Sequence, residues 1–220
     1  MKALRDAALA LLALLALLAP LGLIASAQAH TITFTDHDAT GARLSGVIGG
    51  VGVTLSAATW TRDAFDASTG TGTGTIDLYG PVFDTAALDV SSYGLALRNS
   101  ILDSHLIDGF VLQDVVLFDF DRAVRLTGLG FSFVDADDDF VLFAADVSGA
   151  LSAFSLMDVL SGTVALDVVG RSFGIGAFDA SDAFKLTALS FDVAPVPVPA
   201  ALPLFLGGMG LAGMARRRRA

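Results

Sequence analysis

The segment Asp114–Phe143 constrains the fold most strongly, because long apolar runs in it alternate with short turns. It predicts three strands and two turns, which are Val115–Phe120, the turn Asp121–Arg122, Val124–Val134, the acidic turn Asp135–Asp139 and Phe140–Phe143. Apolar residues occupy both alternating positions in parts of these strands. Strands of that kind are covered on both of their faces. We therefore expect them to lie at the centre of the core.

From His30 onward, short β-branched runs are separated by Gly, Asp and Ser, and apolar residues recur at every second position. This pattern is typical of strands joined by tight turns, whereas the spacing of amphipathic helices is hardly visible. About ten strands without helical partners predict an all-β protein, an antiparallel β-sandwich of jelly-roll type. A closed barrel is the alternative.

Four shorter segments carry more local predictions. Thr69–Gly74 alternates Thr and Gly and predicts a flexible hairpin loop, since it lacks the lysine and the following helix of a phosphate-binding loop. Ala153–Leu160 predicts one or two helical turns. The frame L-T-x-L-x-F recurs at Leu126–Phe131 and Leu186–Phe191 and predicts two strands in similar environments.

Both ends of the chain differ from its middle. Residues 1–29 have a positive start, an Ala/Leu-rich centre and a small residue at each of two positions, Ala27 and Ala29, before a cleavage site. They predict a secretory signal peptide with a signal helix, and an uncleaved anchor is the alternative. Residues 195–220 contain a Pro-rich spacer, an apolar segment and a basic end. The cargo domain expected between the two ends is residues 30–194.

The apolar segment 201–215 predicts a short transmembrane helix. It would extend about 22 Å, less than the roughly 30 Å hydrocarbon core of a bilayer. Its glycines weaken a helix. The basic end stays charged and cytoplasmic, which makes it a membrane stop formed by Arg216, Arg217, Arg218 and Arg219. We expect a temporary anchor, with a permanent single span as the alternative.

The composition excludes several classes of function. The chain has no Cys, which excludes disulfides, thiolate metal sites and a Cys nucleophile. Residues 30–194 contain 22 acidic side chains, all of them Asp, against 7 basic ones, a formal charge of −15. Such a surface repels phosphate backbones, so nucleic acid is not an expected partner.

The acidic turn offers a candidate metal site formed by Asp135, Asp137 and Asp139, because clustered Asp oxygens suit a hard cation such as calcium. Together with Asp146 these acids match positions 1, 3, 5 and 12 of an EF-hand loop. Phe140 replaces the required glycine, however, which excludes an EF-hand. A looser calcium site and a plain solvated turn are the two interpretations, and no other cofactor is expected.

Histidine lies beside aspartate in two segments, Asp36–Asp38 with His37 and Asp103–Asp108 with His105. Neighbouring imidazole and carboxylate groups suit a zinc site or a general base. The chain contains neither G-x-S-x-G nor H-E-x-x-H, so we expect structural or solvent-exposed histidines and no catalytic residue.

Three polar aromatic residues suggest a sugar-stacking surface, namely Trp60, Tyr79 and Tyr93. Aromatic faces of this kind bind carbohydrate in many β-sandwich proteins. Tyr and Trp are equally common at the edges of sheets, which is the alternative interpretation.

The tail closely resembles the VPLPA-CTERM sorting signal, a variant of the PEP-CTERM system of Gram-negative bacteria. The resemblance rests on the Gly-rich apolar segment, the terminal arginines and the sorting motif Val196, Pro197, Val198, Pro199 and Ala200, which departs at Val198 from the family's Leu. It implies recognition by an exosortase-like transpeptidase in the membrane, and the N-terminal signal predicts export through the Sec translocon. The cargo would pass from the inner membrane to the cell surface or the extracellular matrix.

The cargo is similar to the family of exosortase-dependent surface proteins. The similarity rests on His105–Gly109, Asp114–Phe120, Val124–Leu126 and Phe184–Leu186, although the family often has Asp-Asn where this chain has Asp108-Gly109. It implies a surface β domain and carries no established activity. Because the chain shows no catalytic motif, we expect a protein that is not an enzyme, with extracellular polysaccharide as a candidate partner. The alternatives are a carbohydrate-binding or calcium-dependent adhesion module and, more remotely, an extracellular hydrolase.

Overall fold

The computed structural model describes residues 28–36, 38–79, 87–99, 105–110, 112–145, 149–159 and 162–193. All of them belong to one compact unit, Gln28–Ala194. The predicted signal peptide (apart from its last two residues), the sorting tail and the two flanking helices lie outside the described residues. Within the described ranges, no helix is long and apolar enough to cross a membrane.

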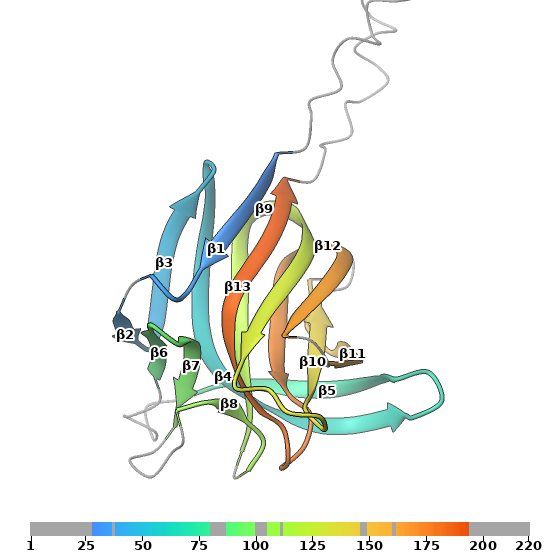
Figure 1. Cartoon of the computed structure of the whole chain (residues 1–220). Coiled ribbons are helices and arrows are strands. Elements are labelled where there is room, and N and C mark those ends of the chain that lie inside the picture. Colours follow the sequence, from blue (N-terminus) through green and yellow to red (C-terminus); the bar gives the residue numbers. More distant parts are fainter. Residues whose placement is uncertain are drawn as a thin grey trace, which may run out of the picture. The chain divides into compact units, whose positions relative to one another are not determined.

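The described residues form thirteen β-strands and no α-helix (Figure 1). In chain order the strands are β1 (Ala29–Thr33), β2 (Ala39–Gly41), β3 (Arg43–Ile48), β4 (Val51–Asp66), β5 (Thr71–Leu78), β6 (Ala87–Ser91), β7 (Gly94–Arg98), β8 (Ile107–Asp108), β9 (Gln113–Ser132), β10 (Asp139–Ala144), β11 (Ala153–Asp158), β12 (Thr163–Ala177) and β13 (Ala183–Val193). All the pairings between these strands are antiparallel. The predicted all-β antiparallel fold is therefore confirmed.

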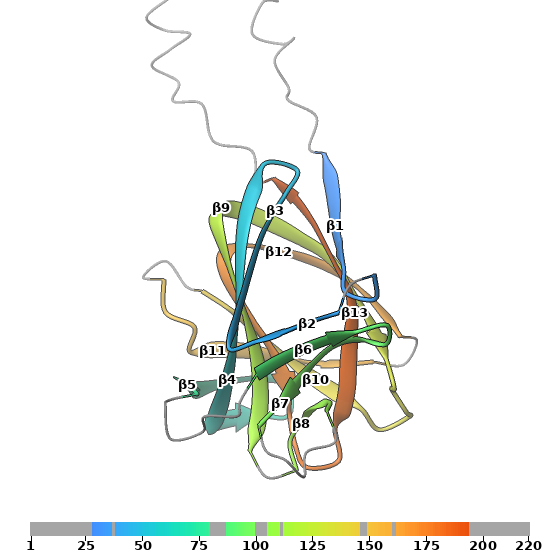
Figure 2. The same cartoon turned by 90° about the vertical axis from the view of Figure 1, so that its left-hand side faces the viewer.

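The strands belong to a single sheet that curls until it meets itself. Hydrogen-bonded neighbours follow the order β2-β6-β7-β13-β9-β12-β10-β11-β5-β4-β3, and β1 and β8 also pair with β13. The long strand β4 pairs with β9 as well, so that β9, β12, β10, β11, β5 and β4 close a ring. Figure 2 shows β2, β6 and β7 side by side, at one end of the strand order. Closure of this kind is a feature of the barrel alternative. The jelly-roll arrangement is not confirmed by this strand order.

Strand β9 is covered on both faces, as its two-sided apolar pattern predicts. Val116, Phe118 and Phe120 are buried in the larger of two core clusters. Val115 and Leu117, which alternate with them, are buried in the smaller cluster. Fully burying a side chain such as Phe118 stabilises the fold by roughly 2–3 kcal/mol. The first half of β9 therefore ties both clusters together.

The predicted turn at Asp121–Arg122 is wrong, because β9 continues through it. The pairing between β9 and β12 changes there from Val124 opposite Gly170 to Asp119 opposite Ser172. Four residues of β9 thus lie opposite one residue of β12, which is a bulge. Asp121 and Arg122 therefore lie at an irregularity within one strand, and not at a turn between two strands.

The two L-T-x-L-x-F segments lie side by side and pair with each other. Leu126 is opposite Phe191 and Phe131 is opposite Leu186 in the β9–β13 pairing. All four side chains are buried in the larger cluster. The prediction that the two segments occupy similar environments is confirmed.

Two local predictions are wrong. Residues 153–158, expected to be helical, form β11, which pairs with β10 and β5. Thr71–Gly74, expected to belong to a flexible loop, lies within β5, where Thr71 and Thr73 are exposed. The alternating glycines face inward instead: a Cβ on Gly72 would lie 2.5 Å from the Phe154 ring, and one on Gly74 would lie 2.9 Å from the Trp60 ring. The repeat is therefore a strand that makes room for two buried rings.

We expect Gly72→Ala to lower the free energy of unfolding by roughly 1–3 kcal/mol, because its methyl group would overlap Phe154 and the Ala64 carbonyl. Gly46→Ala is the matched control, since nothing lies within 4 Å of a Cβ at that strand position. Denaturant titrations of both variants test the point. Equal midpoints would contradict the packing role of Gly72.

Candidate functional site

Asp138 and Asp182 fasten two loops to each other at one end of the sheet. Asp138 lies just before β10, and its carboxylate accepts a hydrogen bond from the Ala183 N–H of β13 at 2.8 Å. Asp182 lies just before β13, and its carboxylate accepts one from the Asp139 N–H of β10 at 2.7 Å. Asp138 thus binds the residue after Asp182, and Asp182 binds the residue after Asp138. Both side chains are buried.

The two loops share a sequence frame, D-A-x-D-x-F, at Asp135–Phe140 and Asp179–Phe184. In each, the first N–H donates to the fourth residue's carboxylate at 2.6 Å. The first carboxylate in turn accepts from the third residue's N–H, at 3.2 Å and 2.9 Å respectively. The sequence predictions missed this repeat, although the frame was visible as a signal. The acidic turn therefore has a structural role, which is to close its own loop and to hold that loop against β13.

The three residues of the candidate metal site have separate surroundings. Asp135 and Asp137 are exposed, and a hydrogen bond that a protonated Asp137 makes to Asp135 raises the pKa of Asp137. Burial, and then the charge of Asp158, raises the pKa of Asp139. The described residues contain no group of three or more metal-ligating side chains. The calcium site stays a prediction.

Replacing Asp182 with Ala should cost roughly 3 kcal/mol of stability, because it leaves the buried N–H of Phe178 and the part-buried N–H groups of Asp179 and Asp139 without their acceptor. Asp137→Ala changes an exposed residue of the equivalent loop and should cost far less. Thermal unfolding of the two variants measures the difference. Similar losses in both variants would show that Asp182 is not a fastening residue.

Asp114 is a buried carboxyl group at the start of β9, with 0% of its surface exposed. Its Oδ1 accepts hydrogen bonds from the Tyr79 hydroxyl at 2.6 Å and from Asn99 Nδ2 at 3.2 Å. Burial raises the pKa of Asp114 to about 7, and the nearby charge of Asp108 adds to the rise, while the two donors oppose it. The group could exchange a proton near neutral pH, but its burial keeps a substrate away from it.

The raised pKa values of Asp114 (about 7) and Asp182 (about 6) predict that stability falls as the pH rises from about 4 to about 7. The folded protein holds these protons at pH values where the unfolded chain has lost them, so lower pH favours folding in this window. Denaturation midpoints between pH 4.5 and pH 8 test this. Asp114→Asn should flatten the profile, whereas the exposed Asp77→Asn should leave it unchanged.

The structure describes the predicted histidine clusters in part. Nδ1 of His105 lies 3.0 Å from the carboxylate of Asp89 on β6. Asp108 accepts a hydrogen bond from the Phe110 N–H at 3.1 Å. Asp103 and His37 lie outside the described residues. An imidazole–carboxylate pair exists, therefore, but with an aspartate that sequence proximity did not indicate.

The three predicted stacking aromatics do not form one surface. Trp60 is buried in the smaller core cluster, where its Nε1 donates to the Ala177 carbonyl at 2.9 Å. Tyr79 is half-buried and bonded to Asp114. Tyr93 alone of the three is exposed. The proposed trio is therefore wrong as a sugar-binding surface, although Tyr93 has a different aromatic neighbour.

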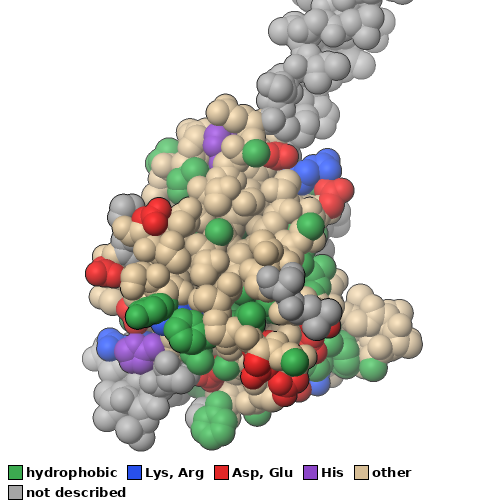
Figure 3. Space-filling view, in the orientation of Figure 1, with side chains coloured by type: hydrophobic (Ala, Val, Ile, Leu, Met, Phe, Trp, Pro, Cys, Tyr) green, Lys and Arg blue, Asp and Glu red, His purple; other side chains and the backbone are tan. Residues whose placement is uncertain are grey.

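Tyr93 and Phe133 form an exposed aromatic pair, with 62% and 57% of their surfaces accessible. Their ring centres are 5.7 Å apart in an edge-to-face arrangement. Nζ of Lys185 lies 6.0 Å from the Tyr93 ring centre and 5.6 Å from that of Phe133. Figure 3 shows exposed hydrophobic side chains beside basic and histidine side chains at the lower left of this face. We call Tyr93, Phe133 and Lys185 together the aromatic–lysine site.

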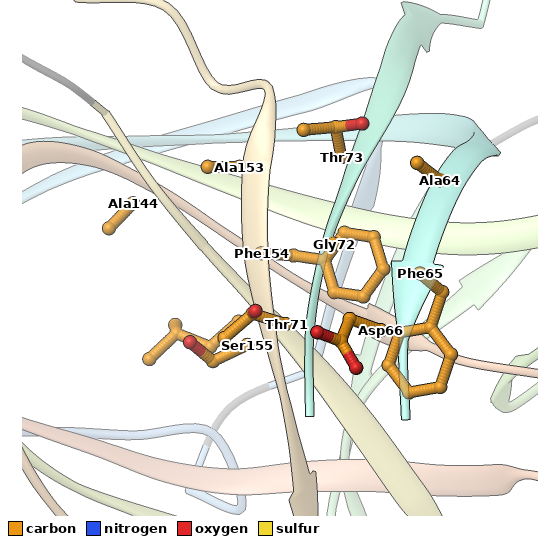
Figure 4. Close-up of a pocket in the computed structure, with 11 residues that line it drawn as sticks. Ala64, Phe65, Asp66, Thr71, Gly72, Thr73, Ala144, Ala153, Phe154 and Ser155 are labelled. Atoms are coloured by element: carbon orange, nitrogen blue, oxygen red, sulfur yellow. The ribbon is translucent and has the colours of Figure 1, made fainter. Parts of the chain in front are cut away.

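A shallow groove of about 570 Å³ lies between β4, β5, β10 and β11 (Figure 4). Phe65 and Phe154 supply its aromatic walls, and Asp66 is the charged residue in its lining. The Asp66 carboxylate accepts hydrogen bonds from the hydroxyl and N–H of Ser68 across the hairpin turn, which lower the pKa of Asp66. The groove thus has one acid, Asp66, which is already engaged in a turn.

No family model matches the chain, and no curated protein or solved structure is similar to it.

Proposed function

We propose that the protein is an exported surface or matrix protein with no catalytic activity of its own, which an exosortase-like transpeptidase sorts through its C-terminal signal. The tripartite tail carries this proposal: the motif Val196–Ala200, the short apolar segment 201–215 and the arginines 216–219. A spacer, a marginal membrane helix and a cytoplasmic basic end together make a sorting signal that a membrane enzyme can recognise.

The extent of the folded domain supports the proposal. The compact unit ends at Ala194, directly before the Pro-rich spacer. At the other end, cleavage after Ala29 would remove only the first, exposed residue of β1 and leave His30–Thr33 paired with β13. Removal of both ends therefore leaves the described sheet almost whole. We further propose that the cargo is a jelly-roll-like sandwich, and the two core clusters on opposite faces of β9 support more than one packed layer.

Deleting residues 196–220 should release the cargo from the membrane fraction and abolish its display at the cell surface, because the sorting enzyme would lose its substrate. Cell fractionation and surface protease digestion measure this. Val198→Leu, which restores the family's residue, should leave sorting intact. If the truncated and the full-length cargo were found in the same compartment, the sorting proposal would be wrong.

A further inference from the structure

Phe133 combines two unfavourable features. Its φ angle is 59°, in the left-handed region, which costs a residue with a side chain roughly 1–2 kcal/mol. Its ring is 57% exposed, so burial only partly offsets that cost. Gly would adopt the same backbone without strain. Strained residues of this kind gather at functional sites, so the exposed ring itself requires an explanation.

Lys185 is an unusual cation in this domain. It is the only lysine in residues 30–194, and only 8% of its surface is exposed. Its ammonium has ring contacts but no ion pair or hydrogen bond with the described residues. Every fully buried side-chain nitrogen and oxygen in the described part has a partner, so this ammonium reaches water. An ammonium that reaches water and has no carboxylate partner among the described residues is available to pair with an anion.

Rigid elements hold the three side chains together. Gly94, with φ of 118°, follows Tyr93 at the β6–β7 turn, and a Cβ there would lie 2.6 Å from the Leu186 carbonyl. This close approach brings the turn against β13. The hydroxyl of Ser132 also donates to the Tyr93 carbonyl at 2.7 Å, and Ser132 pairs with Lys185. Lys185 thus lies within β13, while Tyr93 in the β6–β7 turn and Phe133 directly after β9 are held against it by these contacts.

We propose that the aromatic–lysine site binds an acidic sugar, a hexuronate residue of a polysaccharide. The apolar face of a pyranose stacks on an exposed aromatic ring, and its carboxylate, attached directly to the sugar ring, reaches the ammonium beside that ring. A hydrogen bond between charged groups in this partly desolvated position is stronger than one between neutral groups. A neutral sugar would leave the ammonium unpaired, and a simple anion would leave the rings uncovered. This inference does not depend on the sorting proposal.

Calorimetric titration of the full-length protein at pH 7 and constant salt tests the proposal with three probes: trigalacturonate, its neutral methyl ester and acetate. We expect binding of trigalacturonate, with the ester and acetate weaker by about tenfold or more. Equal binding of the ester would overturn the role of Lys185, and equal binding of acetate would overturn stacking. Absence of trigalacturonate binding would overturn the proposal altogether.

Variants separate binding from folding. Lys185→Met keeps the packed stem and removes the charge, and Phe133→Gly removes both ring and strain, so each should weaken trigalacturonate binding by about tenfold or more. Phe133→Gly should also melt at the same or a higher temperature, since the left-handed backbone suits Gly. Phe110→Ala removes another ring, 78% exposed, as the matched control and should bind normally. Loss of binding in Phe110→Ala equal to that in Phe133→Gly would contradict a specific site.

Discussion

The two-sided burial of β9 is the constraint on which the rest of the structure depends. Its first half pairs with β4 and β12 while its faces contact different core clusters. No side chain between Val115 and Phe118 can therefore be polar without the cost of burying it. Polar groups lie on either side of this segment, with Asp114 before it and Asp119 after it. Asp114, at the first end, is buried beside its donors and holds its proton to near neutral pH because of this position.

Aspartate side chains hold the loops of this domain, which has no disulfides, by hydrogen bonds to backbone N–H groups. The same local contact, from a carboxylate to the N–H two residues on, occurs at four places in the described part of the domain: Asp66, Asp108, Asp135 and Asp179. Asp is short enough to close this turn, whereas the longer Glu side chain is not favoured in it. Part of the acidic composition therefore serves to build loops.

The sequence predicted what depends on neighbouring residues and failed where distant strands decide. Alternation identified the strands and the two-sided burial of β9, because side-chain direction follows the chain with period two. Closure of the ring depends on β4 meeting β9, and no local pattern records that pairing. Residues 153–158 form a strand because β5 and β10 pair with them, although their sequence alone suits helical turns. Trp60 is buried for a similar reason, since the glycines of β5 make room for its ring.

The candidate site was missed because its members come from three separate strands and turns. A single lysine in an acidic domain was a visible signal, but only the structure places it beside Tyr93 and Phe133. If folding alone had shaped these positions, a glycine at 133 would relieve the backbone and an apolar residue at 185 would fill the same space without a charge. Both features occur at one point of the surface. A ligand that covers the rings and pairs with the ammonium accounts for the two together, whereas packing accounts for neither.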